Sequence, residues 1–500
     1  MSKRPQRKSE ATKSKAAKAG AALPLPASAQ LDAAALSDRA RLLWLAGDWV
    51  ALTDIAGQQP ESVQGQPHLA LLLASGFLQL GKMQEAREWI ARAREWGADD
   101  AAITRMLISG TYNSLGRGFY LLGQTTRAQT QFEAAVTMGH AGTAIPQLAA
   151  LRAGEQKSQL ERRRAADQAA RLARQGERLF AAEDWKGARE AFTAAIDLAP
   201  GEARYHQWLG ETEARTGRWD PAVRAWREAL KRDPQVGVAF YRDLPVKTAE
   251  PTQNLVEEPV FIVGCGHSGT SIMLAILGNH PSFYAIPQES SLFRKTDNAA
   301  LAMMAGWDDA RAAEGKRRWI EKTPPNIFHI GRFLKMRPKA RFILMMRDGR
   351  DVVCSLKHRI GYRSFEDRLE RWVYDNMAGL PWWDHPQVKV VKYEDLIENP
   401  PQSLRSICAF LGEDYDAAML EYHKDSHLWY SDEIRNPKHI VSHADHKNFR
   451  NWQINQPLFD GRGRWKNGLS REDLAKFRDS EAPAIMRKAD YDYSPKRGLL

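Results

Sequence analysis

The chain has 500 residues, which is more than one ordinary domain and enough for two or three domains with sizeable cores. Hydrophobic residues make up 43% and charged residues 27%, a balance typical of globular proteins, and no run approaches the roughly 18 uninterrupted apolar residues of a membrane-spanning helix. The net charge of +11 is unevenly distributed, because residues 1–30 contain seven Lys or Arg and only one Glu.

Residues 1–30 are predicted to be a disordered basic tail. They contain no aromatic residue and a single β-branched one, Thr12, so they cannot build a hydrophobic core. Their end, "ASAQ", imitates a signal-peptide cleavage site, but Glu10 lies in the charged part, and Pro24 and Pro26 break the short apolar part. A solvated tail is a commoner outcome for such a run than a nucleic-acid-binding arm, so no nucleic-acid partner is expected.

The three cysteines are Cys265, Cys354 and Cys408. They are scattered, odd in number and without the spacing of metal ligands. This usage predicts a reducing, cytoplasmic location, no disulfide framework and no metal site.

Residues 31–234 are predicted to form an all-α array of helical repeats. "GERLFAAEDWKGAREAFTAAIDLAP" (176–200) and "GETEARTGRWDPAVRAWREALKRDP" (210–234) align at an offset of 34 residues. The aligned pairs are Gly176 with Gly210, Ala188 with Ala222, Phe192 with Trp226, Ala195 with Ala229, and Pro200 with Pro234. The period and the residue types resemble the tetratricopeptide repeat (TPR), in which a small residue lies where two helices cross and an aromatic residue fills the gap.

Two looser copies lie upstream, around residues 74–93 and 116–135, and residues 36–57 are expected to cap the array. A paired-helix unit cannot bury its apolar face alone, so neighbouring units must stack and the aromatic stripes are predicted to be core. The concave face of such an array is expected to take a peptide or a protein partner.

After Pro234 the pattern changes. Residues 235–258 contain two prolines and no sustained period, and are predicted to be a linker. Residues 259–495 are predicted to form an α/β domain, P-loop-like, with a parallel sheet. The expected strands are 259–264, 341–346 and 388–393, and the expected helices are 270–279, 349–359 and 401–411. Ligands of such a sheet bind at the carboxyl ends of its strands.

The first expected strand runs into "GCGHSGTS" (264–271), a turn of glycines and hydroxyl residues at the start of a helix. Backbone N–H groups and the positive helix end can hold an anion there without a charged side chain. The Gly-Lys-Ser/Thr ending of a nucleotide-hydrolysing loop is absent, because His267 precedes Ser268. The turn by itself is weak evidence, and an ordinary capped helix is the alternative.

The second expected strand leads into "RDGRDVVCSLKHR" (347–359), which predicts another anion site. Ser355 and Arg359 are four residues apart and share one face of the expected helix, and Arg347 ends the strand. The arginine fork binds two phosphate oxygens at once. Two phosphate sites on one sheet indicate a ligand that carries phosphate at both ends of a nucleoside.

With both motifs in place, the sequence resembles the sulfotransferase family, whose donor is 3′-phosphoadenosine 5′-phosphosulfate (PAPS). "GCGHSGTSIM" is similar to the family's 5′-phosphosulfate loop, and "RDGRDVVCSL" to its 3′-phosphate motif. "VVKYEDLIENP" and "GRWKNGLS" resemble later segments of the family, in the expected order. The tyrosine- and carbohydrate-directed branch is the most similar one.

The resemblance implies roles for individual residues. Glu289, shortly after the first helix, would be the catalytic base, and Lys322, in a Lys-Thr-Pro turn, would stabilise the leaving group. The donor contacts that it implies are Gly266, His267, Ser268, Gly269, Thr270, Ser271, Arg347, Ser355, Arg359, Tyr393 and Lys466. His267 departs from the pattern, because the family usually has lysine or arginine there, and it is expected to act as a pH-dependent cation beside the phosphosulfate.

The expected activity is metal-free transfer of a sulfuryl group from PAPS to a hydroxyl of a protein tyrosine, a sugar or a small molecule. The repeats would recruit the acceptor or another protein. The alternative is a TPR scaffold whose C-terminal domain only senses a nucleotide or is degenerate, an alternative that His267 keeps open. A P-loop kinase is disfavoured, because the loop lacks Gly-Lys-Ser/Thr.

Overall fold

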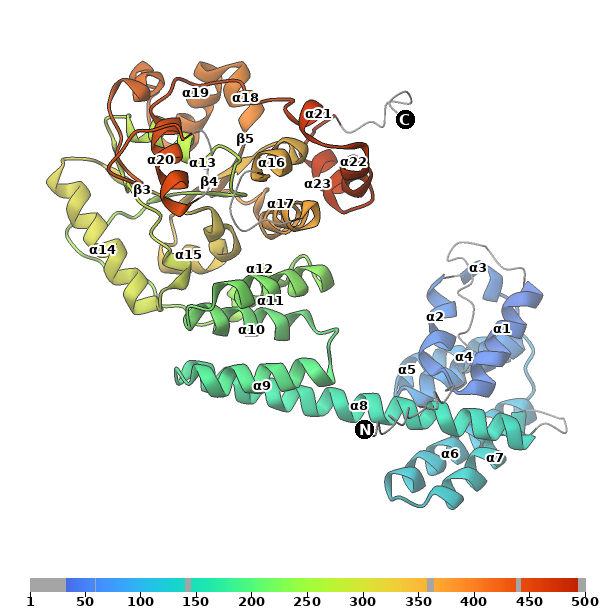
Figure 1. The fold of residues 1–500 in the computed structure, drawn as a ribbon. Coiled ribbons are helices and arrows are strands. Elements are labelled where there is room, and N and C mark those ends of the chain that lie inside the picture. The colour runs from blue at the N-terminus through green and yellow to red at the C-terminus, as the bar shows by residue number, and fades with distance from the viewer. Residues whose placement is uncertain (1–32, 59, 140–144, 358–363, 438–441, 493–500) are drawn as a thin grey trace, which may run out of the picture. The chain divides into compact units, whose positions relative to one another are not determined.

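The computed structural model describes residues 33–58, 60–139, 145–357, 364–437 and 442–492 (Figure 1). The chain divides into two compact units, residues 1–164 and 165–500. Within the described ranges, no helix is both long enough and apolar enough to cross a membrane.

The described part of the N-terminal unit is entirely helical. Its helices are α1 (Ala33–Ala46), α2 (Trp49–Gln58), α3 (Pro60–Val63), α4 (Pro67–Gln79), α5 (Met83–Glu95), α6 (Asp100–Leu121), α7 (Thr125–Gly139) and the first part of α8 (Ile145–Ala181). Buried tryptophan and leucine side chains, among them Trp44, Trp49 and Leu73, fill the space between α1, α2 and α4. The run "RRR" at 162–164 lies exposed on α8.

The C-terminal unit begins with helix pairs of the same kind. They are the second part of α8 with α9 (Trp185–Leu198), and α10 (Ala203–Arg215) with α11 (Trp219–Arg232). A Cβ atom added to Gly176 would lie 2.7 Å from the Phe192 ring, and one on Gly210 would overlap Trp226. Gly116 meets Phe132 in the same way in the N-terminal unit, at 2.6 Å. Glycine is therefore required where each pair crosses, and the predicted helical array is confirmed.

The boundary between compact units lies inside α8 rather than at Pro234, where the repeats end. The segment 235–258, expected as a linker, starts with the helix α12 (Val236–Asp243), whose Val236, Phe240 and Tyr241 are buried. This helix contacts α15 (Ile330–Met336), and α11 contacts α17 (Phe365–Gly379). The last repeat is thus packed against the α/β part, as the green helices beneath the sheet in Figure 1 show.

The described residues of the C-terminal unit form a five-stranded parallel sheet with the order β2-β3-β1-β4-β5. The strands are β1 (Val260–Gly264), β2 (Phe283–Ala285), β3 (Arg318–Lys322), β4 (Arg341–Met346) and β5 (Val388–Lys392). The predicted strands correspond to β1, β4 and β5, so the expected α/β class with a parallel sheet is confirmed. In register, Val260 pairs with both Ile320 and Arg341. The carboxyl ends of β1 and β4 are therefore neighbours.

Alternate side chains of β1 enter different cores, as the period of two in a strand requires. Val260 and Ile262 pack under α13 (Thr270–Gly278) and α19 (Pro400–Leu411). Phe261 and Val263 pack on the opposite face, against α14 (Asp297–Ala313) and α15. Both faces of the sheet are therefore covered by helices, which leaves the strand ends as the place for a site.

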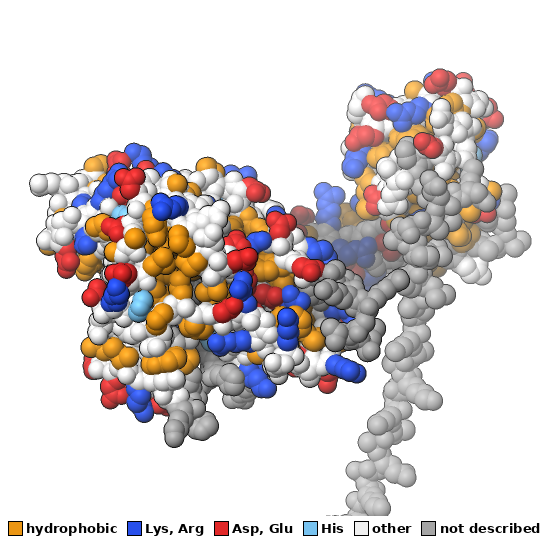
Figure 2. Space-filling model, turned by 90° about the horizontal axis from the view of Figure 1, so that it is seen from above, with side chains coloured by type: hydrophobic (Ala, Val, Ile, Leu, Met, Phe, Trp, Pro, Cys, Tyr) orange, Lys and Arg blue, Asp and Glu red, His pale blue; other side chains and the backbone are white. Residues whose placement is uncertain are grey.

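The remaining elements surround this sheet. They are η1 (Leu292–Arg294), η2 (Pro324–His329), α16 (Gly349–Leu356), η3 (Leu380–Trp382), α18 (Tyr393–Glu398), η4 (Ala417–Lys424), α20 (His443–Ile454), α21 (Trp465–Gly468), α22 (Arg471–Arg478) and α23 (Ala482–Lys488). On the face of this unit that is turned to the top of Figure 1, hydrophobic side chains gather in the middle, with acidic and basic side chains interleaved around them (Figure 2).

Candidate active site

The loop from β1 to α13 makes a tight turn that presents backbone N–H groups. Gly264 has φ +138°, and a Cβ there would overlap the carbonyl oxygen of Met345 on β4. His267 and Gly269 also have positive φ, at +70° and +91°. Successive amides in such a turn, followed by a helix N-terminus, form a concave anion-binding surface. The structure therefore has the turn that the sequence predicted.

Two side-chain donors of the predicted anion sites are buried and unused. Ser268 is 1% exposed, and its Oγ has no hydrogen-bond partner among the described residues. Arg347 is 8% exposed, and its Nε likewise lacks a partner within the described ranges. Leaving a buried donor unsatisfied costs about 1–3 kcal/mol, so each of these groups favours an acceptor such as a phosphate oxygen. The residues present thus fit an anionic ligand.

Arg347 connects three parts of the site. Its Nη1 donates to the carbonyl oxygen of His267 at 3.0 Å, and its Nη2 to that of Gly461 at 2.6 Å. Its guanidinium lies over the Tyr393 ring, with 4.4 Å from Cζ to the ring centroid. The Tyr393 hydroxyl donates to the carbonyl oxygen of Phe459 at 2.9 Å. Two of the predicted donor-contacting residues, Arg347 and Tyr393, therefore lie together beside the loop.

The two predicted anion elements touch each other through His267. Its Nδ1 lies 2.8 Å from the Oγ of Ser355 on α16. The His267 ring thus faces the predicted 3′-phosphate motif, and its action on a phosphosulfate bridge stays a prediction. Arg359, predicted to lie on the same helix face as Ser355, falls outside the described residues.

The predicted base and the predicted leaving-group cation are in contact. Glu289 Oε1 accepts from Lys322 Nζ at 2.8 Å and from Arg450 Nη2 at 2.7 Å. Arg450 Nη2 also lies 3.3 Å from the Oγ of Ser271, the last residue of the loop motif. Lys322 ends strand β3 rather than lying in a turn, and its side chain is 1% exposed. The loop, the carboxylate and two cations therefore form one cluster.

This cluster fixes the charge of Glu289. Burial raises the pKa of the Glu289 carboxyl, but the positive charges of Lys322 and Arg450 outweigh it and hold that pKa far below its ordinary value. Burial also raises the pKa of the Tyr430 phenol, and the same two cations bring it below its usual value. The Arg450 guanidinium lies over the Tyr430 ring at 3.7 Å. Glu289 is thus ionised at neutral pH and paired.

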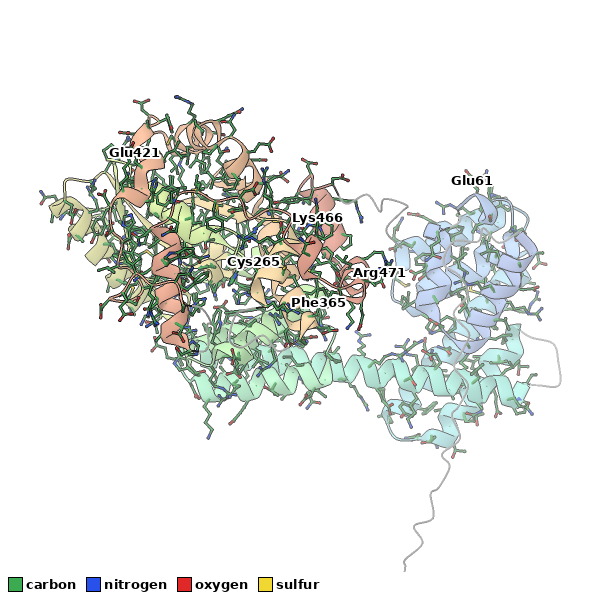
Figure 3. The ribbon with its side chains drawn as sticks, turned by 45° about the horizontal axis from the view of Figure 1, so that its top comes forward. Glu61, Cys265, Phe365, Glu421, Lys466 and Arg471 are labelled. Atoms are coloured by element: carbon green, nitrogen blue, oxygen red, sulfur yellow. The ribbon has the colours of Figure 1, made fainter. Side chains whose placement is uncertain are left out.

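The late segment that was expected to bind the donor is tied to α16. Asp351 accepts from the backbone N–H groups of Gly463 and Trp465 at 2.8 and 3.0 Å, and Arg350 lies over the Trp465 ring. Lys466 follows on α21 with an exposed side chain. Figure 3 labels Lys466 on this C-terminal segment and Cys265 at the end of β1. A donor contact from Lys466 stays a prediction.

Sequence reasoning missed Arg450 and Tyr430. Arg450 reaches Glu289 across 161 positions of the chain, and the surrounding "KNFRNW" carries no local pattern that marks a site residue. A second carboxylate, Glu321, was also missed. It is fully buried beside Lys322 and accepts from Ser290 Oγ at 2.7 Å and Asn326 Nδ2 at 2.8 Å. It anchors the residue that follows Glu289.

Part of this domain matches a known family. Residues 294–417 match the family model described as the sulfotransferase family. That range includes Lys322, Arg347, Ser355 and Tyr393, and lies after the loop and Glu289.

Individual proteins are also similar to this chain over part of its length. A Caenorhabditis briggsae protein, provisionally named a protein-tyrosine sulfotransferase, is 26% identical over 201 residues, covering 34% of this chain and 70% of its own. The protein-tyrosine sulfotransferase of Drosophila melanogaster is 24% identical over 200 residues, covering 33% of this chain and 40% of its own. The solved sulfotransferase domain from the Synechococcus PCC 7002 olefin synthase aligns with 50% of this chain and all of its own, at 17% identity and a TM-score of 0.35. Residues 294–417 of this chain are thus similar to the sulfotransferase family.

Proposed function

We propose that the C-terminal domain transfers a sulfuryl group from PAPS to a hydroxyl group, with a protein tyrosine as the favoured acceptor. The observation that carries the proposal is a pair of buried donors that have no partner among the described residues, Ser268 Oγ and Arg347 Nε, which follow the ends of neighbouring strands beside the Glu289 cluster. The family match supports the reaction class, and the names of two relatives support the tyrosine acceptor.

The loop and α16 would hold the donor. Backbone amides of residues 266–271, with the Ser268 and Thr270 hydroxyls, are suited to the 5′ end, and Arg347 with Ser355 to the 3′-phosphate. PAPS supplies an activated sulfuryl group on the 5′-phosphate. Sulfuryl transfer, like phosphoryl transfer, depends on alignment and charge stabilisation more than on covalent help from the protein.

In the transfer step, the acceptor oxygen forms a bond to sulfur while the bond between sulfur and the bridging oxygen breaks. Glu289 takes the proton of the acceptor hydroxyl. Lys322, Arg450 and the loop amides stabilise the negative charge that develops on the bridging oxygen. His267 stands where the family usually has lysine or arginine, and Arg450, which lies 3.3 Å from Ser271, would supply a permanent charge beside the loop.

The low pKa of Glu289 suits a base only if its cations can leave it, because an efficient base titrates near the working pH. Arg450 contacts Ser271 of the loop as well as Glu289, and Lys322 shares the Glu289 carboxylate with it, so we expect both cations to turn toward a bound phosphosulfate group. Losing them raises the pKa of Glu289 toward its ordinary value, since the opposite charges were what lowered it. Donor binding would then activate the base.

Calorimetry tests the donor, and labelling tests the acceptor. The full chain should bind adenosine 3′,5′-bisphosphate more tightly than ATP, and equal or tighter ATP binding would refute the donor assignment. Sulfur-labelled PAPS should then label a tyrosine-containing peptide pool and leave matched phenylalanine peptides unlabelled. Bisphosphate binding without transfer to protein, sugar or small-molecule acceptors would favour the nucleotide-sensing scaffold instead.

A further inference from the structure

The last helical repeat contacts both segments that carry the proposed catalytic pair. Glu289 is followed by η1 and the start of α14, and Lys322 is followed by η2. All of these elements and the repeat α10–α11 belong to the same compact unit. We propose that α10–α11 positions Glu289 and Lys322 for the reaction, which makes this repeat part of the catalytic apparatus and not only a recruitment surface.

The contact with the Glu289 segment begins at Trp219, the first residue of α11. The Trp219 ring lies 4.0 Å from the Phe293 ring, centroid to centroid. The Arg294 guanidinium also lies over the Trp219 ring, with 5.2 Å from Cζ to the ring centroid. Phe293 is 2% exposed and follows Glu289 by four residues. Trp219 thus fixes one end of the short stretch whose other end is Ser290, held by Glu321.

Arg215, at the end of α10, holds the same stretch by its backbone. Its Nη1 donates to the carbonyl oxygen of Lys295 at 3.1 Å, and its Nη2 lies 3.7 Å from Asp297 Oδ1. Arg332 from α15 binds the same two acceptors, at 2.7 and 2.8 Å. The Arg215 side chain is only 5% exposed, so its charge must be met by these groups and by Glu211.

The Lys322 segment meets the repeat through η2. The Phe328 ring stacks on Trp226 of α11 with 5.5 Å between centroids. His329 Nδ1 lies 3.6 Å from Glu211 Oε1 and 2.7 Å from the Tyr241 hydroxyl, which also donates to Glu211. Glu211, Tyr241 and His329 are buried, so this network leaves η2 little freedom.

The preceding repeat, α8–α9, lacks an arginine at the position that corresponds to Arg215, so the repeat fold does not require this residue. The residue equivalent to Arg215, 34 positions earlier, is Ala181, and the one equivalent to Trp219 is Trp185. Trp185 packs within the array, against Phe180 at 5.0 Å. The arginine is therefore specific to the repeat that adjoins the catalytic segments.

This inference rests on the proposed roles of Glu289 and Lys322, and its test has a readout that does not need the reaction. Hydrogen exchange of residues 287–297 is measured in the full-length wild type, Trp219→Leu and the matched Trp185→Leu. Within that stretch, the N–H groups of Arg294 and Lys295 donate to Ser291 and Leu292. Trp219→Leu should speed their exchange by about tenfold or more, and Trp185→Leu should not.

The same variants are assayed for bisphosphate binding by calorimetry and for turnover, followed as bisphosphate released from PAPS. Trp219→Leu should keep the affinity of the wild type and lose kcat by about tenfold or more, as misplaced catalytic groups do, and Trp219→Phe should restore it. Unchanged exchange, or faster exchange with unchanged kcat, overturns the inference. If Trp219→Leu does not fold, Arg215→Lys replaces it, with the same readouts and the same overturning results. A wild type that does not bind the bisphosphate refutes the proposed function, whereas the exchange comparison still decides whether the repeat orders residues 287–297.

Discussion

Arg347 offers the sharpest test of the donor site, because it should recognise one end of the ligand and not the other. The Arg347→Ala variant loses the Nε, which has no partner in the part of the chain that the structure describes, and both carbonyl contacts of the guanidinium. A hydrogen bond to a charged group contributes about 1.5–3 kcal/mol. At about 1.4 kcal/mol per tenfold change, the affinity for adenosine 3′,5′-bisphosphate should fall roughly 10-fold to 150-fold. Since Arg347 is 8% exposed, solvent screening is weak and the upper part of that range is expected.

The loss of the two carbonyl contacts also disturbs the protein, and a second ligand separates this effect. 5′-AMP lacks the 3′-phosphate but uses the same loop, so any general damage weakens both ligands alike. The ratio of the two affinities, measured by calorimetry on each variant, therefore isolates the 3′-phosphate. The wild-type preference for the bisphosphate should largely disappear in Arg347→Ala.

Arg350 provides the matched control three residues further on. Its Nη2 lies 2.7 Å from Asp348 Oδ2 and its guanidinium lies over Trp465, so Arg350→Ala should leave the ratio of affinities unchanged. If Arg347→Ala weakens 5′-AMP and the bisphosphate equally, Arg347 only holds the loop to Gly461, and the assignment of a 3′-phosphate site at α16 is wrong.

Three further predictions concern the cluster, the loop and the array. Glu289→Gln should lower the urea midpoint at pH 7, because Lys322 loses its counter-ion. Since the folded pKa of Glu289 is depressed, this difference should persist above its unfolded value of about 4.3 and shrink as pH falls below it, so a constant difference would contradict the pairing. His267→Asn should keep kcat within several-fold, because asparagine tolerates the positive φ at this position. Arg450→Gln should lower kcat by about tenfold or more. The reverse order of effects would return the leaving-group role to His267. Gly210→Ala should destabilise the protein by about 1–3 kcal/mol, because the added methyl group would overlap Trp226. Gly154→Ala, on α8 with open space around it, should be neutral or stabilising in the same urea titration. Equal effects would refute the argument that glycine is required where the helices cross.

The repeats and the central strands could be predicted from the sequence, because the repeats recur at a fixed offset and the strands are continuous apolar runs. An offset of 34 residues pairs Gly176 with Gly210, and the structure shows why both are glycine. β1 and β4 are continuous apolar runs, as strands covered on both faces must be. β3 was missed because its sequence, "RWIEK", has charged residues at both ends. These residues are buried because they have partners in the fold. Lys322 pairs with Glu289, and Glu321 accepts from Thr323 and Asn326.

The candidate site was predictable where it is local in sequence. The loop 264–271 and the pair Arg347 and Ser355 each lie within a few residues of a strand end, so their types and spacing carry the signal. Arg450 contributes through tertiary structure alone, since α20 brings it to Glu289 from the far end of the domain. The contact of α10–α11 with η1 was hidden for the same reason, because a repeat pattern describes how a unit packs on its neighbour in the array and not what the terminal unit meets.

The pairing of Glu289 with Lys322 explains why a buried lysine is tolerated. An ammonium that is 1% exposed needs an opposite charge, because burying an unpaired ion costs several kcal/mol. Glu289 provides that charge, and its second cation, Arg450, draws the same carboxylate toward Ser271 of the loop. The carboxylate is thereby held between the donor loop and the start of η1, which the last repeat fixes from the other side. A donor that takes over both cations would leave Glu289 ionised, unpaired and still anchored by its flanking residues, which is the state that a base for an incoming hydroxyl requires.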